Sequence, residues 1–313
     1  MTPPRELVVI SGKGGTGKTS VVAALAALAG GAVLADCDVD AADLHLVLDP
    51  KLGTEHEFSG RRQAIIDPAA CTACGRCAEV CRFAAVLGAA TDDYSIDSIA
   101  CEGCELCRRV CPADAIHMEP VINGAWMVSE TRFGPLVHAR LGVAEDNSGK
   151  LVTLVRNAAR RTAEEHGFPL VIVDGSPGLG CPVISSLAGA DLVLAVTEPT
   201  VSGRYDLDRV LQVVRQFRLP FAVCINKADL NPELGAQIAA EASAAGAAFV
   251  ATVDYDPAVT RAQVAGTDVI NYGDRAAAEI TKLWEAVSAS LSPSPEKQVL
   301  DGWQRASPPA ASS

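Results

Sequence analysis

Residues 12–19 read GKGGTGKT, and this glycine-rich stretch decides the fold class. It fits the pattern G-x-x-x-x-G-K-[ST], in which backbone N–H groups surround phosphate groups. The run ELVVISG before it predicts a buried strand, and KTSVVAALAALAG after it predicts a helix ending at Gly30. That helix would direct its positive end at the phosphates. A glycine-rich turn without a ligand is the alternative, but strand, loop and helix together favour a nucleotide site.

The loop supplies most of the predicted nucleotide contacts. Lys18 should reach the β- and γ-phosphates, and Thr19 should offer its hydroxyl to Mg²⁺. The residues of this stretch expected to bind the nucleotide are Gly12, Lys13, Gly14, Gly15, Thr16, Gly17, Lys18, Thr19 and Ser20.

Further strands and helices alternate along the rest of the chain. Apolar runs predict strands at AVLADCDVD, LVIVDGS, LVLAVTEP, FAVCINKAD and AFVATVDYD, and GAWMVSETRFGPLVHARL is expected to be extended. Helical patterns lie between them, and RAAAEITKLWEAVSASL predicts a last helix at 275–291. A composition that is 49% hydrophobic and 4% aromatic suits helices packed on a parallel sheet. The predicted fold is α/β, a doubly wound, mostly parallel sheet of the P-loop NTPase type.

The helix and strand pattern breaks from about residue 61, where cysteines accumulate. We therefore expect a P-loop ATPase domain in two parts, 1–60 and 120–291, around a small inserted α+β domain at 61–119 that resembles a bacterial ferredoxin. Residues 292–313 are rich in Pro, Ser and Ala and are expected to form a disordered tail.

The insert contains two cysteine quartets, CTACGRCAEVC at 71–81 and CEGCELCRRVC at 101–111. Each has the spacing C-x-x-C-x-x-C-x-x-x-C, in which three thiolates hold one [4Fe–4S] cluster and the fourth ligates the other cluster. Zinc is the alternative, but zinc sites usually separate two C-x-x-C pairs by a longer loop. Proline follows the second quartet and Arg82 follows the first, which removes no ligand. The predicted ligand sets are Cys71, Cys74, Cys77 and Cys111 for one cluster, and Cys101, Cys104, Cys107 and Cys81 for the other.

Charge and hydropathy exclude several classes of protein. The formal net charge of −12 disfavours sequence-independent DNA binding, so no nucleic-acid partner is expected. No apolar run is long enough to span a membrane, and the first residues do not resemble an export signal. Together with the clustered cysteines, these features predict a cytoplasmic protein whose thiols bind metal.

Lys13, directly after the first glycine, adds a resemblance to a known family. KGGTGKT resembles the deviant phosphate loop of the MinD/ParA ATPases and of the nitrogenase iron protein. In that family the extra lysine reaches the partner's nucleotide, so the resemblance implies an ATP-dependent homodimer with Lys13 in its catalytic set. Taken alone, Lys13 could be a solvated loop lysine.

Three further motifs fit this resemblance. ADCDVD implies that Asp38 orients the attacking water and that Asp36 supports the metal site. LVIVDGSPGLG ends a strand at Asp174, a carboxylate suited to hold Mg²⁺ through water beside a mobile switch loop. NKAD resembles the adenine-recognising position, with Asn226 the expected base contact and Lys227 next to it.

The resemblance covers residues 5–58 and 121–290. DGSPGLGCPV, VTEPTVSG and GPLVHARLG look most like a subgroup of these ATPases with an inserted ferredoxin domain. Cys181 stands at the offset from the switch aspartate where the nitrogenase iron protein has a cluster ligand, so it is a candidate extra ligand; a capping or packing role is the alternative. Cys37 and Cys224 fall within predicted strands and are expected to be core residues.

Three functions remain open at this point. The first is an ATP-hydrolysing dimeric switch whose nucleotide state controls electron transfer through two [4Fe–4S] clusters, with ATP and Mg²⁺ as the other cofactors and an unknown redox partner. The second is an ATPase that assembles or carries iron–sulfur or metal clusters. The third, favoured least, is a spatial-positioning ATPase with structural clusters. Complete ferredoxin-type ligation favours the first, because a carrier should release its cluster easily.

Overall fold

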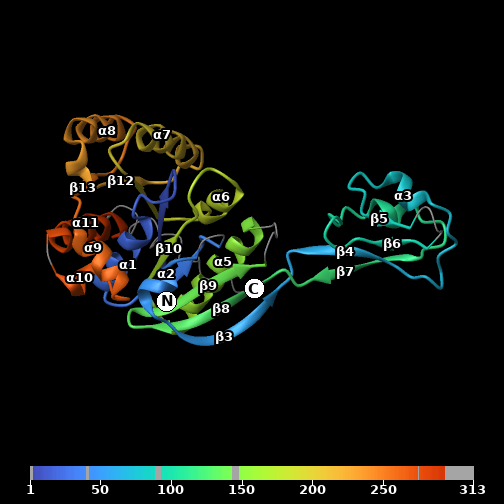
Figure 1. The fold of residues 1–313 in the computed structure, drawn as a ribbon. Helices are drawn as coiled ribbons and strands as arrows, with labels where there is room; N and C mark the ends of the chain where they lie inside the picture. The colour runs from blue at the N-terminus through green and yellow to red at the C-terminus, as the bar shows by residue number, and fades with distance from the viewer. Residues whose placement is uncertain (1–2, 40–41, 89–92, 143–147, 274, 293–313) are drawn as a thin grey trace, which may run out of the picture.

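The computed structural model describes residues 3–39, 42–88, 93–142, 148–273 and 275–292. Within them, one large sheet has nine strands, and those from β13 to β9 run parallel (Figure 1). β8 pairs antiparallel with both β9 and β3 at one edge. In spatial order the strands are β13 (Val250–Val253), β12 (Phe221–Asn226), β11 (Leu192–Thr197), β1 (Arg5–Ser11), β10 (Leu170–Asp174), β2 (Val33–Asp36), β9 (Gly134–Leu141), β8 (Gly124–Thr131) and β3 (Lys51–Phe58).

Helices cover both faces of this sheet, because its central strands are apolar on both sides. In β1, Val8 and Ile10 pack into one core and Leu7 and Val9 into the other, as alternation along a strand requires. The first core is covered by α5 (Ser148–His166), α6 (Cys181–Leu187), α7 (Val201–Gln216) and α8 (Pro232–Ala244). The second is covered by α1 (Lys18–Leu28), α2 (Leu44–Leu48), α9 (Pro257–Val264), α10 (Val269–Tyr272) and α11 (Arg275–Leu291). The predicted α/β class is therefore confirmed.

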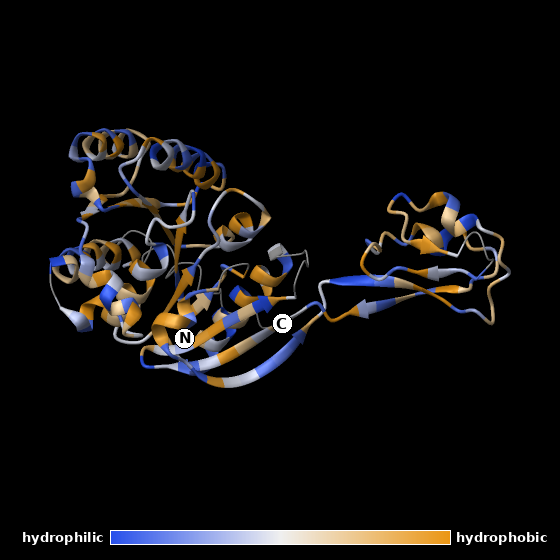
Figure 2. Ribbon diagram, viewed as in Figure 1, coloured by the Kyte–Doolittle hydropathy of each residue, from blue (hydrophilic) through white to orange (hydrophobic). Residues whose placement is uncertain are grey.

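The extended segment 124–141 forms the hairpin β8–β9, and β3 adds an outer strand that the sequence analysis did not predict. β3 reads KLGTEHEF, and every residue before Phe58 is exposed. Charged residues on an edge strand prevent it from pairing with another chain. They also mean that a search for apolar runs does not detect the strand. Figure 2 shows the contrast between the apolar central strands and the more hydrophilic β3.

The cysteine-rich insert extends from the end of β3 (Figure 1). Its two outer strands, β4 (Arg61–Ile66) and β7 (Ile116–Val121), pair antiparallel and link it to β3 and β8. Inside lie the helices α3 (Arg76–Val80) and α4 (Leu106–Val110) and the short pair β5 (Val86–Leu87) and β6 (Ser95–Ile96). At its root, the Asn123 side chain accepts a hydrogen bond from the Gly60 N–H at 2.8 Å.

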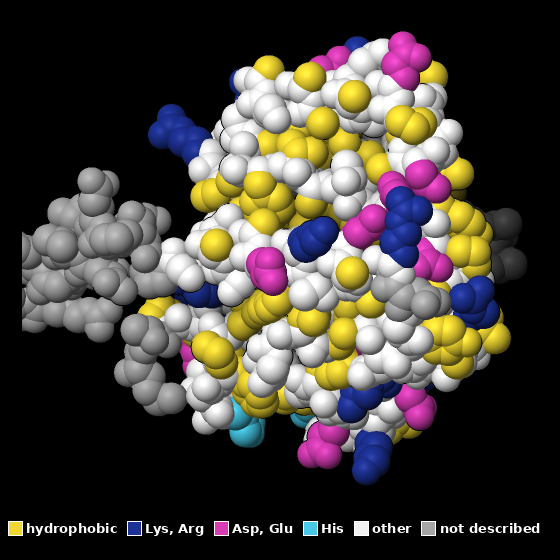
Figure 3. Space-filling model, turned by 90° about the vertical axis from the view of Figure 1, so that its left-hand side faces the viewer, with side chains coloured by type: hydrophobic (Ala, Val, Ile, Leu, Met, Phe, Trp, Pro, Cys, Tyr) yellow, Lys and Arg dark blue, Asp and Glu magenta, His cyan; other side chains and the backbone are white. Residues whose placement is uncertain are grey.

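The described residues bear on the expected membrane span, surface charge and C-terminal tail. No helix among them is long and apolar enough to cross a membrane. The face in Figure 3 carries Lys and Arg side chains interspersed with Asp and Glu. The predicted tail lies outside the described residues from position 293 onward.

Candidate functional site

The glycine-rich loop connects β1 to α1 and borders a cavity of about 420 Å³. Because β1 lies between the parallel strands β10 and β11, their carboxyl ends converge here, where α/β sheets bind ligands. From the loop and its flanks the cavity is lined by Ser11, Gly14, Gly15, Thr16, Gly17, Lys18, Thr19 and Ser20. The predicted residues Asp38, Asn226 and Lys227 also line it, whereas Gly12, Lys13, Asp36 and Asp174 lie outside its lining.

Two glycines of the loop are required by close approach. A Cβ on Gly12 would lie 2.8 Å from the backbone of Asp206 in α7, so a larger residue would push the loop from that helix. Gly17 has a φ of 89°, and a Cβ there would lie 2.3 Å from the Asn226 side-chain nitrogen. The loop therefore holds its shape through contacts with β12 and α7 as well as through its own backbone.

Lys18 lies at the centre of a buried ionic cluster. Its ammonium pairs with Asp174, and the Asp38 carboxylate is 3.6 Å away. Asp174 also accepts a hydrogen bond from the Thr19 hydroxyl at 2.8 Å. Burial alone would lower the pKa of Lys18, but the charge and hydrogen bond of Asp174 and the charge of Asp38 raise it above its ordinary value. Lys18 therefore remains charged at neutral pH, as a phosphate-binding lysine must.

Asp36 is fully buried beneath this cluster. Its carboxylate accepts hydrogen bonds from the backbone N–H groups of Asp38 and Leu44, both at 3.2 Å. Burial and the nearby Asp174 charge raise the pKa of Asp36 well above its usual range. These contacts fix the turn that carries Asp38 and the start of α2.

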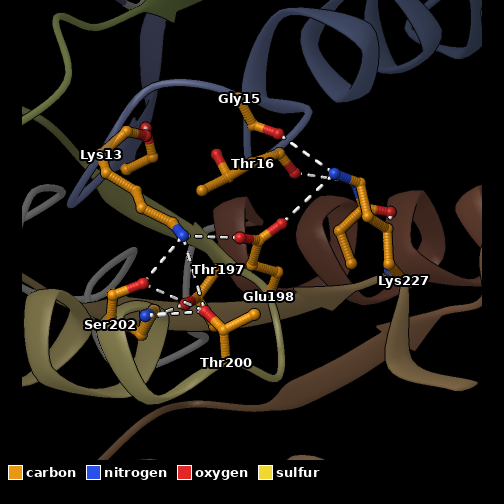
Figure 4. A network of polar contacts seen from close by, with 11 residues as sticks. Lys13, Gly15, Thr16, Thr197, Glu198, Thr200, Ser202 and Lys227 are labelled. Carbon is orange, nitrogen blue, oxygen red and sulfur yellow. Dashed lines mark hydrogen bonds and ion pairs between the residues drawn. The ribbon is translucent and has the colours of Figure 1, made fainter. Parts of the chain in front are cut away.

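Figure 4 shows how Lys13 and Lys227 converge on Glu198 at the end of β11. The Lys13 ammonium lies 2.6 Å from one carboxylate oxygen of Glu198, and the Lys227 ammonium lies 3.2 Å from the other. Lys13 also donates to the Ser202 hydroxyl at 3.0 Å, and Lys227 donates to the Gly15 carbonyl at 3.1 Å. Burial would raise the pKa of Glu198, but these two lysines lower it. Glu198, which the motifs did not single out, thus joins both lysines of the site.

Asn226 binds the loop through its own side chain. Its amide donates to the Thr16 carbonyl at 2.8 Å, and its side-chain oxygen accepts the Lys227 N–H at 3.0 Å. The far side of the cavity is formed by α9 and by the loop between β13 and α9. The motifs did not single out this side, although Asp254 and Asp256, at the end of a predicted parallel strand, were a usable signal. The residues that line it are Asp254, Tyr255, Asp256, Val259, Thr260 and Gln263.

The cysteines of the insert line two separate cavities. The first cysteine cavity is lined by Cys71, Cys74, Cys77 and Cys111. The second cysteine cavity is lined by Cys81, Cys101, Cys104 and Cys107. Each contains three cysteines of one quartet and the last cysteine of the other, the exchange that ferredoxin-type spacing predicts.

The two halves of the insert repeat each other at an offset of 30 residues, the separation of Cys71 and Cys101. Positive φ angles recur at that offset, in the pairs Ala73 and Gly103, Gly75 and Glu105, and Ala84 and Asp114. Hydrogen bonds to sulfur recur too: the Ala85 N–H donates to Cys81 Sγ at 3.4 Å and the Ala115 N–H to Cys111 Sγ at 3.3 Å. The same backbone therefore surrounds both cavities.

The donor chemistry fits a cluster better than a single ion. Among the described residues, no three His, Cys, Asp or Glu side chains are grouped closely enough to hold one metal ion. Four thiolates around a cavity, with N–H groups donating to sulfur, suit the corners of a larger iron–sulfur cube. Zinc would draw four sulfurs to about 2.3 Å from one point.

The other three cysteines lie outside the insert. Cys37 and Cys224 are fully buried, as expected of core residues, and burial raises the pKa of the Cys224 thiol to about 12. Cys181 is exposed at the first position of α6, and a Cβ placed on Gly149 of α5 would lie 3.3 Å from its Cβ. It therefore belongs to the contact between α5 and α6 and to neither quartet.

Comparisons with known proteins agree with both parts of the chain. Residues 64–118 match the 4Fe-4S dicluster domain family. The chain is 36% identical over 230 residues to uncharacterized protein MJ0578 of Methanocaldococcus jannaschii, which covers 72% of this chain and 79% of that protein. The fold resembles the Pyrococcus furiosus cell division ATPase MinD, with a TM-score of 0.55, 19% identity and coverage of 91% of this chain and 98% of that one.

A second solved structure is similar to the same degree. It is the septum site-determining protein MinD of Pyrococcus horikoshii, complexed with Mg-ADP, with a TM-score of 0.54 and 18% identity over 91% of this chain and 96% of that one. The identities to both MinD structures are low, so these likenesses establish the fold. The chain thus belongs to the family of M. jannaschii MJ0578, and it joins a MinD/ParA-type P-loop ATPase fold to a 4Fe-4S dicluster domain.

Proposed function

We propose that the protein is a dimeric ATPase whose nucleotide state controls electron transfer through two [4Fe–4S] clusters. The observation that carries this proposal is the presence, in one chain, of a phosphate-loop cavity and two four-cysteine cavities. Clusters ligated in this way accept and release single electrons. An ATPase fold joined to them offers a way to time that transfer.

In the nucleotide cavity, Lys18 would neutralise phosphate charge and Thr19 with Asp174 would hold Mg²⁺. Mg²⁺ prefers hydroxyl, carboxylate and water oxygens, which these side chains supply. Mg-ADP in the P. horikoshii MinD structure supports the same ligand here. Asp254 and the neighbouring residues of the far wall would enclose the base and ribose.

Asp38 lines the cavity beside Lys18 and is our candidate for the residue that orients the attacking water. We expect Asp38→Ala to bind ATP normally but to hydrolyse it about 10²- to 10⁴-fold more slowly. Binding and single-turnover hydrolysis should be measured separately. Asp43→Ala is the matched control, because Asp43 lines the same cavity and has no assigned role. Equal loss of binding and hydrolysis in Asp38→Ala would contradict the assignment.

The two cysteine quartets should bind about eight irons per chain, four in each cavity. Anaerobic protein should show two reducible clusters by electron paramagnetic resonance. Cys104→Ala should lose the cluster of the second cysteine cavity and about half of the iron, whereas Cys181→Ala, outside both quartets, should keep all of it. Stoichiometric zinc without reducible iron would refute the redox proposal.

A continuous series of contacts joins the predicted switch loop to the root of the insert. The loop runs from Asp174 to α6, where Cys181 packs against Gly149 of α5. The next residue of α5, Lys150, donates to the Gly60 carbonyl at 2.8 Å, directly before β4. A movement of the loop with the γ-phosphate would thus reach the insert through α6 and α5.

A cluster carrier or assembly ATPase is the second candidate, and the exposure of Cys181 favours it. A labile cluster shared between two Cys181 thiols would add iron beyond the eight of the insert. Such iron should be lost in Cys181→Ala and should transfer to an apoprotein. Iron that stays at eight per chain, with or without Cys181, supports the redox function.

A further inference from the structure

The repeat in the insert allows the surroundings of the two cysteine cavities to be compared position by position. Each cavity has one exposed cysteine, Cys74 or Cys104, and one buried cysteine, which is Cys77 in the first cavity and Cys101 in the second. Each cavity also has one matching hydrogen bond from a backbone N–H to sulfur. Backbone and ligands are therefore nearly equivalent. We therefore expect a difference in how the two clusters take up an electron to come mainly from the other side chains around the cavities.

Those side chains differ most in charge. Arg76, the first residue of α3, lines the first cysteine cavity, and its repeat equivalent Leu106, the first residue of α4, lines the second. At two other equivalent positions the first cavity has Thr72 and Gly75, whereas the second has Glu102 and Glu105. One lining is therefore cationic and the other anionic.

Other cations lie near the second cavity and reduce this contrast. Glu105 pairs with Arg62 at 3.6 Å and with Arg108 at 3.8 Å, and Arg61 donates to the Cys101 carbonyl at 3.0 Å. None of these three arginines is among the residues that line the cavity. Because a charge acts more strongly from a shorter distance, we expect the lining residues to set the sign of the difference.

Polarity adds to the effect of charge. Tyr94 lines the first cavity, and its hydroxyl oxygen would lie 3.1 Å from a Cβ on Gly75. The equivalent position beside the second cavity is Ala64, and Phe83 and Met118 cover that cavity. Reduction of a [4Fe–4S]²⁺ cluster to [4Fe–4S]⁺ adds one negative charge, which cations and hydroxyl dipoles stabilise and which apolar or anionic surroundings oppose.

We propose that Arg76 raises the reduction potential of the cluster in the first cysteine cavity above that of the other, so that a single electron in the insert rests there. An electron entering at the second cluster would pass to the first, returning the second to [4Fe–4S]²⁺ and reducing the first to [4Fe–4S]⁺. Electron transfer within the insert would then run from the second cysteine cavity to the first. The inference rests on the proposed assignment of one cluster to each cavity.

Exchange of the two equivalent residues tests this order. Dithionite would reduce anaerobic full-length protein, and both potentials would be followed by electron paramagnetic resonance. Arg76→Leu should lower the higher of the two potentials. The equilibrium constant for one-electron reduction of that cluster should fall by a few-fold to tenfold, and tenfold corresponds to about 59 mV. Leu106→Arg should raise the lower potential, and the double exchange should reverse the order. Leu106 is 40% exposed, so an arginine there can reach solvent.

Two further variants separate charge from structure. Arg76→Lys keeps the charge and should keep the order, whereas Arg109→Leu removes an exposed charge that lines neither cavity and should change neither potential. Equal potentials in the unaltered protein, or an Arg76→Leu effect on the lower potential, would overturn the inference while leaving two clusters in place. Fewer than two reducible clusters in the unaltered protein would overturn the cluster assignment and the inference together.

Discussion

Lys18→Met should weaken ATP binding by about 100-fold or more. The variant loses a charge-assisted contact worth about 1.5–3 kcal/mol, and each 1.4 kcal/mol is tenfold in affinity. It also leaves Asp38 and Asp174 without the cation that pairs with them, so that their charges would repel the incoming phosphates. Isothermal calorimetry with Mg-ATP would measure the loss.

Methionine is chosen because it retains most of the lysine chain in a buried position. Loss of a buried ionic partner can itself destabilise a protein, so the thermal unfolding midpoint should be compared in the same buffer. Lys282→Met is the control, because Lys282 is an exposed residue of α11. Unchanged ATP affinity in folded Lys18→Met would show that the cavity does not bind nucleotide through this loop.

The sequence predicts the parts of this molecule that depend on local patterns. The phosphate loop, the alternating apolar runs and the cysteine spacing are each read over a few residues, and the helix expected at 275–291 has the same bounds in the structure. The grouping of cysteines around the two cavities also follows the spacing, because Cys81 lines the cavity of the second quartet and Cys111 that of the first. That each group binds a cluster stays a prediction.

Features that depend on contacts between distant residues were not predictable in this way. β3 is polar because it is an edge, so its sequence has no strand signal. Glu198 and Lys13 are far apart in the chain, and only the parallel order of β1 and β11 brings them together. Asn226 resembles a base-reading residue in its motif, yet its amide is bonded to the Thr16 carbonyl.

The second large effect concerns the dimer. ATP, but not ADP, should convert the protein from monomer to dimer, because only ATP has a γ-phosphate for Lys13 of the opposite chain. Lys13→Ala should remain monomeric with ATP while keeping both clusters. Analytical ultracentrifugation should compare ATP-loaded Asp38→Ala with the double variant that also carries Lys13→Ala, and it would measure the fraction of dimer in each. Asp38→Ala is the background because its slow hydrolysis preserves the ATP state. A Lys13→Ala variant that still dimerises would contradict the proposed role.

Glu198 should oppose this step. In the single chain its carboxylate pairs with Lys13, so dimerisation must exchange that carboxylate for a phosphate. The exchange is possible because a γ-phosphate carries more charge than one carboxylate. In the empty and ADP-bound states, the ion pair with Glu198 would keep Lys13 from reaching a partner chain.

We propose that nucleotide state and cluster reduction are coupled in this protein. The coupling free energy between two linked sites is usually about 1–3 kcal/mol, which for a one-electron couple corresponds to a shift in potential of about 40–130 mV. The shift should be smaller in Lys150→Ala, because Lys150 links α5 to Gly60 at the root of the insert. The reciprocal effect follows by linkage: reduction of the clusters should change ATP affinity by the same factor.

The most direct test is potentiometry of both clusters in the nucleotide-free, ADP-bound and ATP-bound protein, with dimerisation verified in the same samples. The proposed function predicts that at least one potential shifts by about 40–130 mV between the ADP and ATP states, and that Lys13→Ala removes the shift. Potentials that are identical in all three states, in protein that dimerises with ATP, would contradict it.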